Sequence, residues 1–171
     1  MRKVILSVAI SLDGYIEGPD GEYDWCFTDQ DYGLKDFYKS VDTVFVGRKT
    51  YTMIRDAGGS YFKFRQYVFS TTLKEVDKNS ILVSGNIERE VDKIKRQEGK
   101  DIWVFGGAGL TTSLLNKGLI DEIHLALHPI LLGSGKPLFK DIDNRMGLTL
   151  IDSKTYPSGL IGLKYGVSNE Q

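Results

Sequence analysis

The chain has 171 residues, with 22 basic and 23 acidic side chains and a formal net charge of −1, and this length suits one domain over residues 1–171. Its 41% hydrophobic and 26% charged residues are ordinary for a globular protein. The balanced charge excludes the basic surface typical of proteins that bind nucleic acid or anionic membranes, and the single cysteine, Cys26, excludes an internal disulfide.

The chain begins with a short apolar run. Residues 4–10 are almost continuously apolar, which predicts a strand buried on both faces. This run is too short to cross a bilayer, and the turn residues Asp13 and Gly14 follow it at once, so we expect neither a membrane segment nor a signal peptide. With one cysteine and no targeting segment, the protein is expected in the cytoplasm.

Helices and strands then alternate through the first two thirds of the chain. Leu34, Phe37, Tyr38 and Val41 recur at the i, i+3, i+4, i+7 spacing of one helix face. The same kind of reasoning predicts, in chain order, a helix over 34–41, a strand over 41–46, a short helix over 50–55, strands over 67–70 and 81–84, a helix over 87–94, a strand over 102–105 and a helix over 110–117.

The last third of the chain is richer in β-forming residues. Residues 122–132, 148–153 and 160–167 predict strands, and a turn at 157–159 joins the last two. Strands joined by a short turn are antiparallel. The layout therefore predicts an α/β fold whose sheet is of mixed direction.

The most informative segment is Phe105-Gly106-Gly107-Ala108-Gly109-Leu110, at a junction between a predicted strand and a predicted helix. In open α/β sheets, ligands bind beyond the carboxyl ends of the strands, where helix N-termini present free N–H groups to anions. Three glycines in four positions let a pyrophosphate approach the backbone closely. The alternative is a turn that only lets the helix pack on its strand.

A second junction, Val46-Gly47-Arg48-Lys49-Thr50, delivers two cations and a hydroxyl to a helix start. Cations are unfavourable at a helix N-terminus unless an anion binds there, and an arginine grips phosphate well. The alternative is a surface Arg-Lys pair. A third cluster, Ser70 and Thr71, follows a predicted strand, although such hydroxyls usually cap turns.

Four segments taken together and in order resemble the dihydrofolate reductase superfamily, and more closely the RibD C-terminal (riboflavin biosynthesis reductase) domain family with its small stand-alone bacterial relatives. They are SLDGYI at 11–16, GRKTY at 47–51, FGGAGL at 105–110 and LLGSGKPLF at 131–139. The resemblance implies a single-domain fold of dihydrofolate-reductase type, with a mostly parallel central sheet flanked by helices and with antiparallel C-terminal strands.

The resemblance also implies NADPH as the cofactor and a hydride transfer as the reaction. By resemblance, the phosphates, pyrophosphate and nicotinamide meet residues spread over the strand ends. These are Ala9, Ile16, Gly47, Arg48, Thr50, Ser70, Thr71, Phe105, Gly106, Gly107, Ala108, Gly109 and Leu110. The expected substrate is a small heterocycle that is pterin-like or ribosylaminopyrimidine-like. The alternative is a module that binds NADPH or a nucleotide without turnover.

The sequence gives weaker signals for the residues that would bind the substrate and supply the proton. Trp25 resembles a tryptophan of the family's mobile loop, and counting onward from it to the family's carboxylate leads to Gln30. Asp29 and Asp31 flank this position, and these two or a water molecule are the candidates for the proton donor. Trp25 and Phe37 are candidates to stack on a flat substrate, although Phe37 equally suits the core face of its helix.

Two further expectations concern metals and assembly. His124 and His128 are four residues apart in a predicted strand, which separates them by about 13 Å, so they do not share an ion and we expect no metal site. Family likeness suggests a homodimer. The apolar segment 123–132 offers either an interface or a buried central strand, and the two are compatible.

Overall fold

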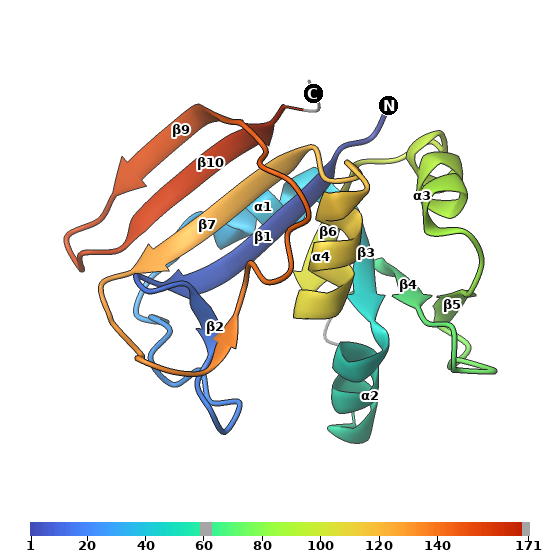
Figure 1. Cartoon of the computed structure of the whole chain (residues 1–171), viewed down its shortest axis with the longest axis horizontal. Helices are drawn as coiled ribbons and strands as arrows, with labels where there is room; N and C mark the ends of the chain where they lie inside the picture. Colours follow the sequence, from blue (N-terminus) through green and yellow to red (C-terminus); the bar gives the residue numbers. More distant parts are fainter. Residues whose placement is uncertain (59–62, 169–171) are drawn as a thin grey trace.

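The computed structural model describes residues 1–58 and 63–168. An eight-stranded sheet runs through the molecule in the order β5-β4-β3-β6-β1-β7-β10-β9 (Figure 1). Its strands are β1 (Val4–Ser11), β3 (Val41–Gly47), β4 (Arg65–Phe69), β5 (Ser80–Val83), β6 (Asp101–Gly106), β7 (Glu122–His128), β9 (Leu148–Thr155) and β10 (Ile161–Val167). A separate ribbon pairs β2 (Tyr15–Glu17) with β8 (Lys136–Pro137).

The direction of the strands confirms the predicted mixed sheet. The pairs from β5 through β7 are parallel, whereas β10 pairs antiparallel with both β7 and β9. Parallel strands need crossover connections, and a helix lies in each of them except the one from β4 to β5, which is the loop 70–79. These helices are α1 (Leu34–Ser40), α2 (Arg48–Asp56), α3 (Ile87–Lys95) and α4 (Ala108–Asn116).

The helices cover both faces of the sheet and define two hydrophobic clusters. Figure 1 shows α4 in front of the sheet and α1 behind it. The larger cluster includes Leu114 of α4 and Ile94 of α3, and the smaller one joins Tyr51 of α2 to Trp103 of β6, with Phe37 of α1 packed against it. Burial on both faces explains the nearly continuous apolar sequence of β1.

Several helices and strands begin or end at other residues than the sequence predicts. Helices α2 and α4 each start two residues earlier than predicted, directly after Gly47 and Gly107. Strand β7 stops at His128 rather than at residue 132, because Pro129 has no N–H to continue the ladder. The ribbon of β2 and β8 was not predicted, since two or three residues carry no periodicity.

Segment 123–132 lies partly in the middle of the sheet. Its residues 123–128 belong to β7, which is hydrogen-bonded to β1 on one side and β10 on the other. Strand β9 forms the edge instead, and all eight of its residues are exposed. In the described part of the chain, no helix is long and apolar enough to span a membrane.

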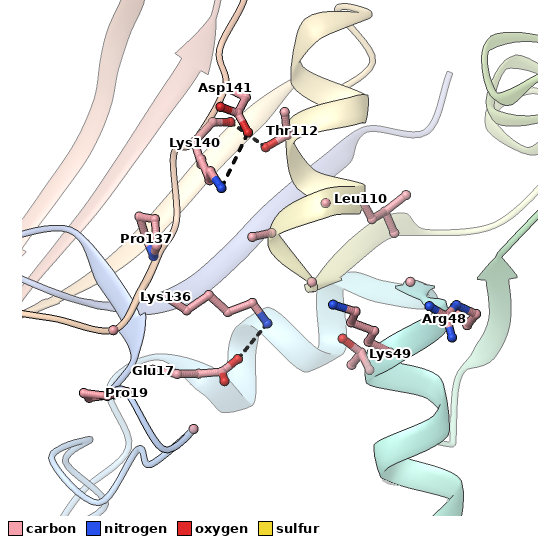
Figure 2. Close-up of a pocket in the computed structure, with 18 residues that line it drawn as sticks. Glu17, Pro19, Arg48, Lys49, Leu110, Thr112, Lys136, Pro137, Lys140 and Asp141 are labelled. Carbon is pink, nitrogen blue, oxygen red and sulfur yellow. Dashed lines mark hydrogen bonds and ion pairs between the residues drawn. The ribbon is translucent and has the colours of Figure 1, made fainter.

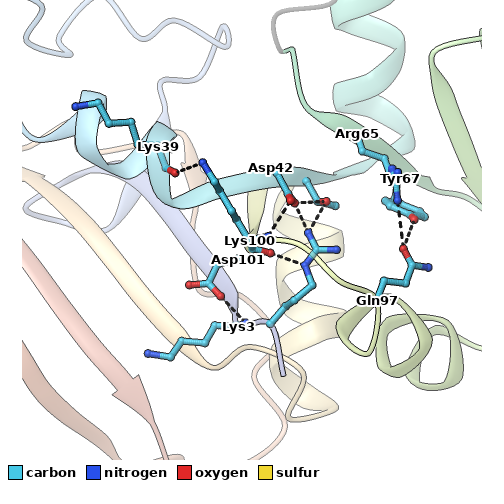
Figure 3. A network of polar contacts seen from close by, with 10 residues as sticks. Lys3, Lys39, Asp42, Arg65, Tyr67, Gln97, Lys100 and Asp101 are labelled. Carbon is cyan, nitrogen blue, oxygen red and sulfur yellow. Dashed lines mark hydrogen bonds and ion pairs between the residues drawn. The ribbon is translucent and has the colours of Figure 1, made fainter.

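A buried arginine, Arg2, joins the amino ends of three central strands of the sheet, and Figure 3 shows its partners Asp42 and Lys100 side by side. The Arg2 guanidinium donates to the carboxylate of Asp42, the hydroxyl of Thr43 and the carbonyl oxygen of Lys100. The other carboxylate oxygen of Asp42 accepts from the Lys100 backbone N–H at 2.8 Å. One ion pair thus links the starts of β1, β3 and β6.

We expect Asp42→Ala to destabilise the fold more than Arg2→Met does. The side chain of Arg2 is 4% exposed and that of Asp42 is 41% exposed, so removing Asp42 leaves the more buried charge unpaired. Urea unfolding should show a loss of about 2–4 kcal/mol for Asp42→Ala and a smaller loss for Arg2→Met. Lys39→Ala, which breaks an exposed pair, is the control and should change stability by less than about 0.5 kcal/mol. Equal losses of stability for Asp42→Ala and Arg2→Met would contradict this account.

Candidate functional site

A cavity of about 870 Å³ opens at the carboxyl edge of the sheet (Figure 2). It lies between the N-termini of α2 and α4 on one side and the β2–β8 ribbon on the other. The lining residues are Glu17, Gly18, Pro19, Gly21, Gly47, Arg48, Lys49, Thr50, Gly107, Ala108, Gly109, Leu110, Thr112, Gly135, Lys136, Pro137, Lys140 and Asp141. Both sequence motifs at strand–helix junctions therefore meet in one place.

The two helix N-termini come together because their strands are neighbours. Strands β3 and β6 run parallel, with Val46 opposite Gly106. A Cβ on Gly107 would lie 3.2 Å from Thr50 Oγ1, and a Cβ on Gly47 would lie 3.5 Å from Leu110 Cβ. Each glycine thus faces a side chain of the other helix; a Cβ at Gly47 would make an ordinary contact, whereas a Cβ at Gly107 would press on Thr50.

Backbone N–H groups at both helix starts are free to bind a ligand. Gly47 and Gly107 are the N-cap residues, and neither supplies a side-chain hydrogen bond to its helix. Gly107 has a φ of 93°, a conformation that side chains with a Cβ rarely adopt. Uncapped N–H groups together with the partial positive charge of a helix N-terminus favour an anion.

The side chains around the cavity add positive charge. Four cations, Arg48, Lys49, Lys136 and Lys140, line it against two carboxylates, Glu17 and Asp141. Lys136 Nζ lies 3.0 Å from Glu17 Oε1, and Lys140 Nζ lies 3.9 Å from Asp141 Oδ2. Over residues 1–58 and 63–168, neither Arg48 nor Lys49 has an ion-pair partner. The arrangement suits a ligand with several negative charges.

The far wall depends on a close approach of two backbones. Gly135 has a φ of 137°, and a Cβ there would lie 2.1 Å from the carbonyl oxygen of Glu17, so no other residue fits. Asp13 holds the preceding loop, because its carboxylate accepts from the backbone N–H groups of Leu132 and Gly133 at 3.1 and 2.7 Å. The hydrogen bond from the Ser11 hydroxyl, with those from the backbone, keeps the pKa of Asp13 below its usual range.

Several predicted cofactor residues do not line this cavity. Ala9 lies in β1 opposite Ala126, and Ile16 packs against the larger hydrophobic cluster. Ser70 and Thr71 follow β4 at the same edge of the sheet, but the Ser70 hydroxyl accepts from the N–H of Leu73 at 3.0 Å, as in a turn. Phe105 and Gly106 end β6, just before the lining residues begin. The motif residues at 47–50 and 107–110 all line the cavity, including Lys49, which had no predicted role.

Sequence reasoning missed the residues of the ribbon side. Segment 131–139 supported the family resemblance, yet its Gly135, Lys136 and Pro137 had no predicted place in a site. Lys140, Asp141 and Thr112 were missed as well. A cluster of basic residues next to a Gly-Ser-Gly turn was the available signal, but only the fold brings it opposite Arg48.

The two candidate proton donors lie away from the cavity. Asp29 and Asp31 are exposed. Asp29 Oδ1 accepts from the Tyr32 hydroxyl at 2.7 Å, and Asp31 Oδ1 accepts from the Lys35 N–H at 3.2 Å, in the first turn of α1. The first-turn carboxylate of α1, Asp36, has a side chain that is 88% exposed and pairs with a lysine. The assignment of Asp29 and Asp31 as donors stays a prediction.

The two candidate substrate-binding aromatics pack against the sheet on the side of α1. The Trp25 ring contacts His128 edge-on, with a centroid distance of 5.2 Å. Phe37 lies 5.5 Å from the Trp103 ring and 6.0 Å from His124, and it belongs to the smaller hydrophobic cluster. The structure thus supports the core role of Phe37 that the sequence had left open beside a binding role.

The two histidines have separate partners. His124 Nε2 lies 2.8 Å from Glu122 Oε2; burial lowers the pKa of His124, although Glu122 opposes that shift. His128 instead contacts the loop that precedes α1. Within the part of the chain that the structure describes, no three potential metal-ligating side chains are grouped.

Comparison with known proteins identifies the relatives of this chain. The family model of the RibD C-terminal domain matches residues 2–161. The uncharacterized protein YyaP of Bacillus subtilis strain 168 is 41% identical over 181 residues, which cover 96% of this chain and 94% of that protein. A crystal structure of a Shewanella sp. PV-4 protein named for riboflavin biosynthesis has a TM-score of 0.86 and 26% identity, covering 98% of this chain and 99% of its own.

A more distant structure shares the fold alone. Dihydrofolate reductase of Enterococcus faecalis, solved in complex with NADP(H), superposes with a TM-score of 0.70 at 15% identity, over 98% of this chain and 97% of its own. The fold is therefore that of the dihydrofolate reductases, as the sequence motifs predicted.

Two glycines of the same motif should respond oppositely to alanine. Gly107→Ala forces a Cβ into a left-handed conformation 3.2 Å from Thr50 and should lower stability by about 1–3 kcal/mol. Gly109 lies in the first turn of α4, and a Cβ there would meet nothing within 4 Å, so Gly109→Ala should be neutral or stabilising by up to about 1 kcal/mol. Thermal unfolding of both variants measures this. A destabilised Gly109→Ala together with an unaffected Gly107→Ala would contradict the geometry.

Proposed function

Because the chain belongs to the RibD C-terminal domain family, we propose that it is an NADPH-dependent reductase that transfers a hydride to a small heterocyclic substrate, pterin-like or ribosylaminopyrimidine-like. The family is one of reductases, and its fold is shared with a dihydrofolate reductase that was solved with NADP(H). The observation that carries the proposal is the cavity between two uncapped helix N-termini, which suits a dinucleotide with a pyrophosphate and one further phosphate.

The residues of the cavity fit the parts of NADPH. Free N–H groups at residues 107–110 suit the pyrophosphate, because glycines there let its oxygens come close to the backbone. The guanidinium of Arg48 suits the 2′-phosphate that distinguishes NADPH from NADH, since its fork of donors matches phosphate geometry. Thr50 adds a hydroxyl at the same helix start.

The chain's own part in the reaction is binding, orientation and exclusion of water. NADPH, when bound, supplies the hydride. The two helix N-termini fix the phosphates, and the end of β1 with Ala9 borders the place proposed for the nicotinamide. The proton would come from Asp29, Asp31 or a water molecule, and both carboxylates are exposed to solvent.

The alternative function is a module that binds NADPH without turnover. The position of Asp29 and Asp31 favours it, since both lie in the loop before α1 and neither lines the cavity. This alternative predicts cofactor binding with no oxidation of NADPH by any pterin or pyrimidine. A screen of pterins, folates and ribosylaminopyrimidines, following NADPH absorbance, separates the two functions.

Removing Arg48 should weaken NADPH binding selectively. We expect Arg48→Gln to raise the Kd for NADPH by about 10- to 100-fold, the effect of losing a charged hydrogen-bonding group, and to leave NADH binding nearly unchanged. Isothermal titration calorimetry measures both ligands. Arg89→Gln, on the exposed face of α3, is the matched control and should behave like the wild type. Equal losses of affinity for NADPH and NADH would contradict the assignment of the 2′-phosphate to Arg48.

We also propose that the protein forms a homodimer through strand β9. Leu148, Leu150 and Ile151 are 45%, 54% and 53% exposed on this edge strand. The first half of β9 is mostly apolar, and an exposed apolar stretch on an edge strand is prone to pair with another chain. A second copy is the simplest occupant, because β9 pairing antiparallel with β9 about a two-fold axis covers both edges with one symmetric contact. Figure 1 shows no helix over this part of the sheet.

A charge on β9 should separate the dimer. The wild type should elute with twice the chain mass of 19.2 kDa, and Leu150→Lys should shift to the monomer, because a buried lysine opposes the pairing. Size-exclusion chromatography with light scattering measures the masses. Ile81→Lys, on the opposite edge strand β5, replaces a side chain that is 43% exposed and should remain dimeric. A monomeric wild type would refute the proposal.

A further inference from the structure

A buried histidine is one of the attachments that join the loop of residues 18–33, between β2 and α1, to the sheet. His128, at the end of β7, is 3% exposed. Its Nε2 accepts a hydrogen bond from the backbone N–H of Phe27 at 3.1 Å. The rings of Trp25 and Phe27 pack on the imidazole with centroid distances of 5.2 and 5.0 Å. The middle of the loop thus closes around this side chain.

The hydrogen bonds fix the charge and tautomer of this imidazole. Its Nδ1 lies 2.9 Å from the carbonyl oxygen of Ala126, which only accepts, so Nδ1 carries a proton. Its Nε2 faces the N–H of Phe27, which only donates, so Nε2 carries none. The contact therefore requires a neutral ring. A second proton on Nε2 would place two donors against each other.

The register of the strands places this contact beside the proposed site of hydride transfer. His128 lies opposite Ser11, and Ala126 lies opposite Ala9, the residue proposed to border the nicotinamide. The start of the same loop, at Gly18, Pro19 and Gly21, lines the cavity. The loop that His128 holds therefore begins at the cavity and passes beside the place proposed for the nicotinamide.

We propose that His128 is a positioning residue: its neutral imidazole holds the Trp25–Phe27 part of the loop closed on the sheet, and its protonation releases that part. The loop keeps a second attachment, because the Tyr32 hydroxyl lies 3.0 Å from the Ser158 hydroxyl in the turn between β9 and β10. Release at His128 thus opens the middle of the loop about fixed ends. Only the effect on ligand binding rests on the proposed function.

Other titratable groups lie on the elements that pack against His128. The loop carries five carboxylates, Asp20, Glu22, Asp24, Asp29 and Asp31, and all of them are exposed. Burial raises the pKa of the Cys26 thiol to about 11, so the thiol stays neutral. At the end of β1, the Asp13 carboxylate is occupied by the N–H groups of Leu132 and Gly133. On β7 itself, His124 faces Glu122 and Phe37 of α1 rather than the loop.

Fluorescence of the ligand-free protein tests the contact directly. The chain has two tryptophans, Trp25 and Trp103. When the pH is lowered from 8 to 5, the wild type should show one transition in which the Trp25 emission shifts to the red as its ring leaves the sheet. Trp25→Phe should abolish the transition. His124→Gln, the matched control on the same strand, should keep it.

Two substitutions at His128 make the test decisive. Gln supplies an acceptor oxygen near the position of Nε2 and gains no proton, so His128→Gln should keep the blue-shifted emission at both pH values. Leu supplies no acceptor, so His128→Leu should show red-shifted Trp25 emission throughout. Far-UV circular dichroism checks that each variant is folded. A transition in His128→Gln equal to that of the wild type, or none in the wild type, would overturn the proposal.

Binding of NADP⁺ separates this inference from the proposed function. Between pH 8 and pH 5, the affinity for NADP⁺ should fall about tenfold more in the wild type than in His128→Gln. The titration of the ligand phosphate affects both proteins equally, so the comparison removes it. If NADP⁺ does not bind but the fluorescence transition occurs and depends on His128, the cofactor proposal fails and the role of His128 stands. If NADP⁺ binds with the same pH dependence in both proteins, the role of His128 in binding fails.

Discussion

The contact between the N-termini of α2 and α4 is the constraint on which the candidate site depends. Gly107 lies against Thr50, and Gly47 lies against Leu110, so the two helix starts are in contact, and at residue 107 the positive φ and the short distance to Thr50 favour glycine. This contact exists because β3 and β6 are parallel neighbours that end at the same level. It directs two sets of uncapped N–H groups into one cavity and leaves Arg48 and Lys49 beside them. The β2–β8 ribbon then closes the opposite wall, held by the approach of Gly135 to Glu17.

Much of the fold was predictable because its elements bury apolar faces with regular spacing. The helix of α3 and the strands β1, β3 and β6 follow from the positions of apolar side chains alone. The early starts of α2 and α4 could not be predicted from this spacing, since Gly47 and Gly107 are N-cap residues that each lie against the other helix. The ribbon was hidden for the same reason, because it depends on a close approach between residues far apart in the chain.

The candidate site was predictable only where chemistry and position coincide in one short segment. The motifs at 47–50 and 105–110 mark strand ends in the sequence, and the fold brings them together. Asp29 and Asp31 were placed by counting from Trp25, a procedure that says nothing of the direction of a side chain. In the structure Asp29 accepts a hydrogen bond from the Tyr32 hydroxyl, and Asp31 accepts one from a backbone N–H in the first turn of α1. His128 was considered only as a metal ligand, whereas its role as an acceptor for the Phe27 N–H depends on the course of the loop.

The central claim is that both helix N-termini bind one dinucleotide, and an NMR titration of ¹⁵N-labelled protein with NADP⁺ tests it most directly. The account predicts that the amide signals of residues 48–50 and of residues 108–110 shift together, with one Kd, while the amides around the Arg2–Asp42 pair at the opposite edge of the sheet do not move. Shifts at only one helix start, or at neither in a folded sample, would contradict it.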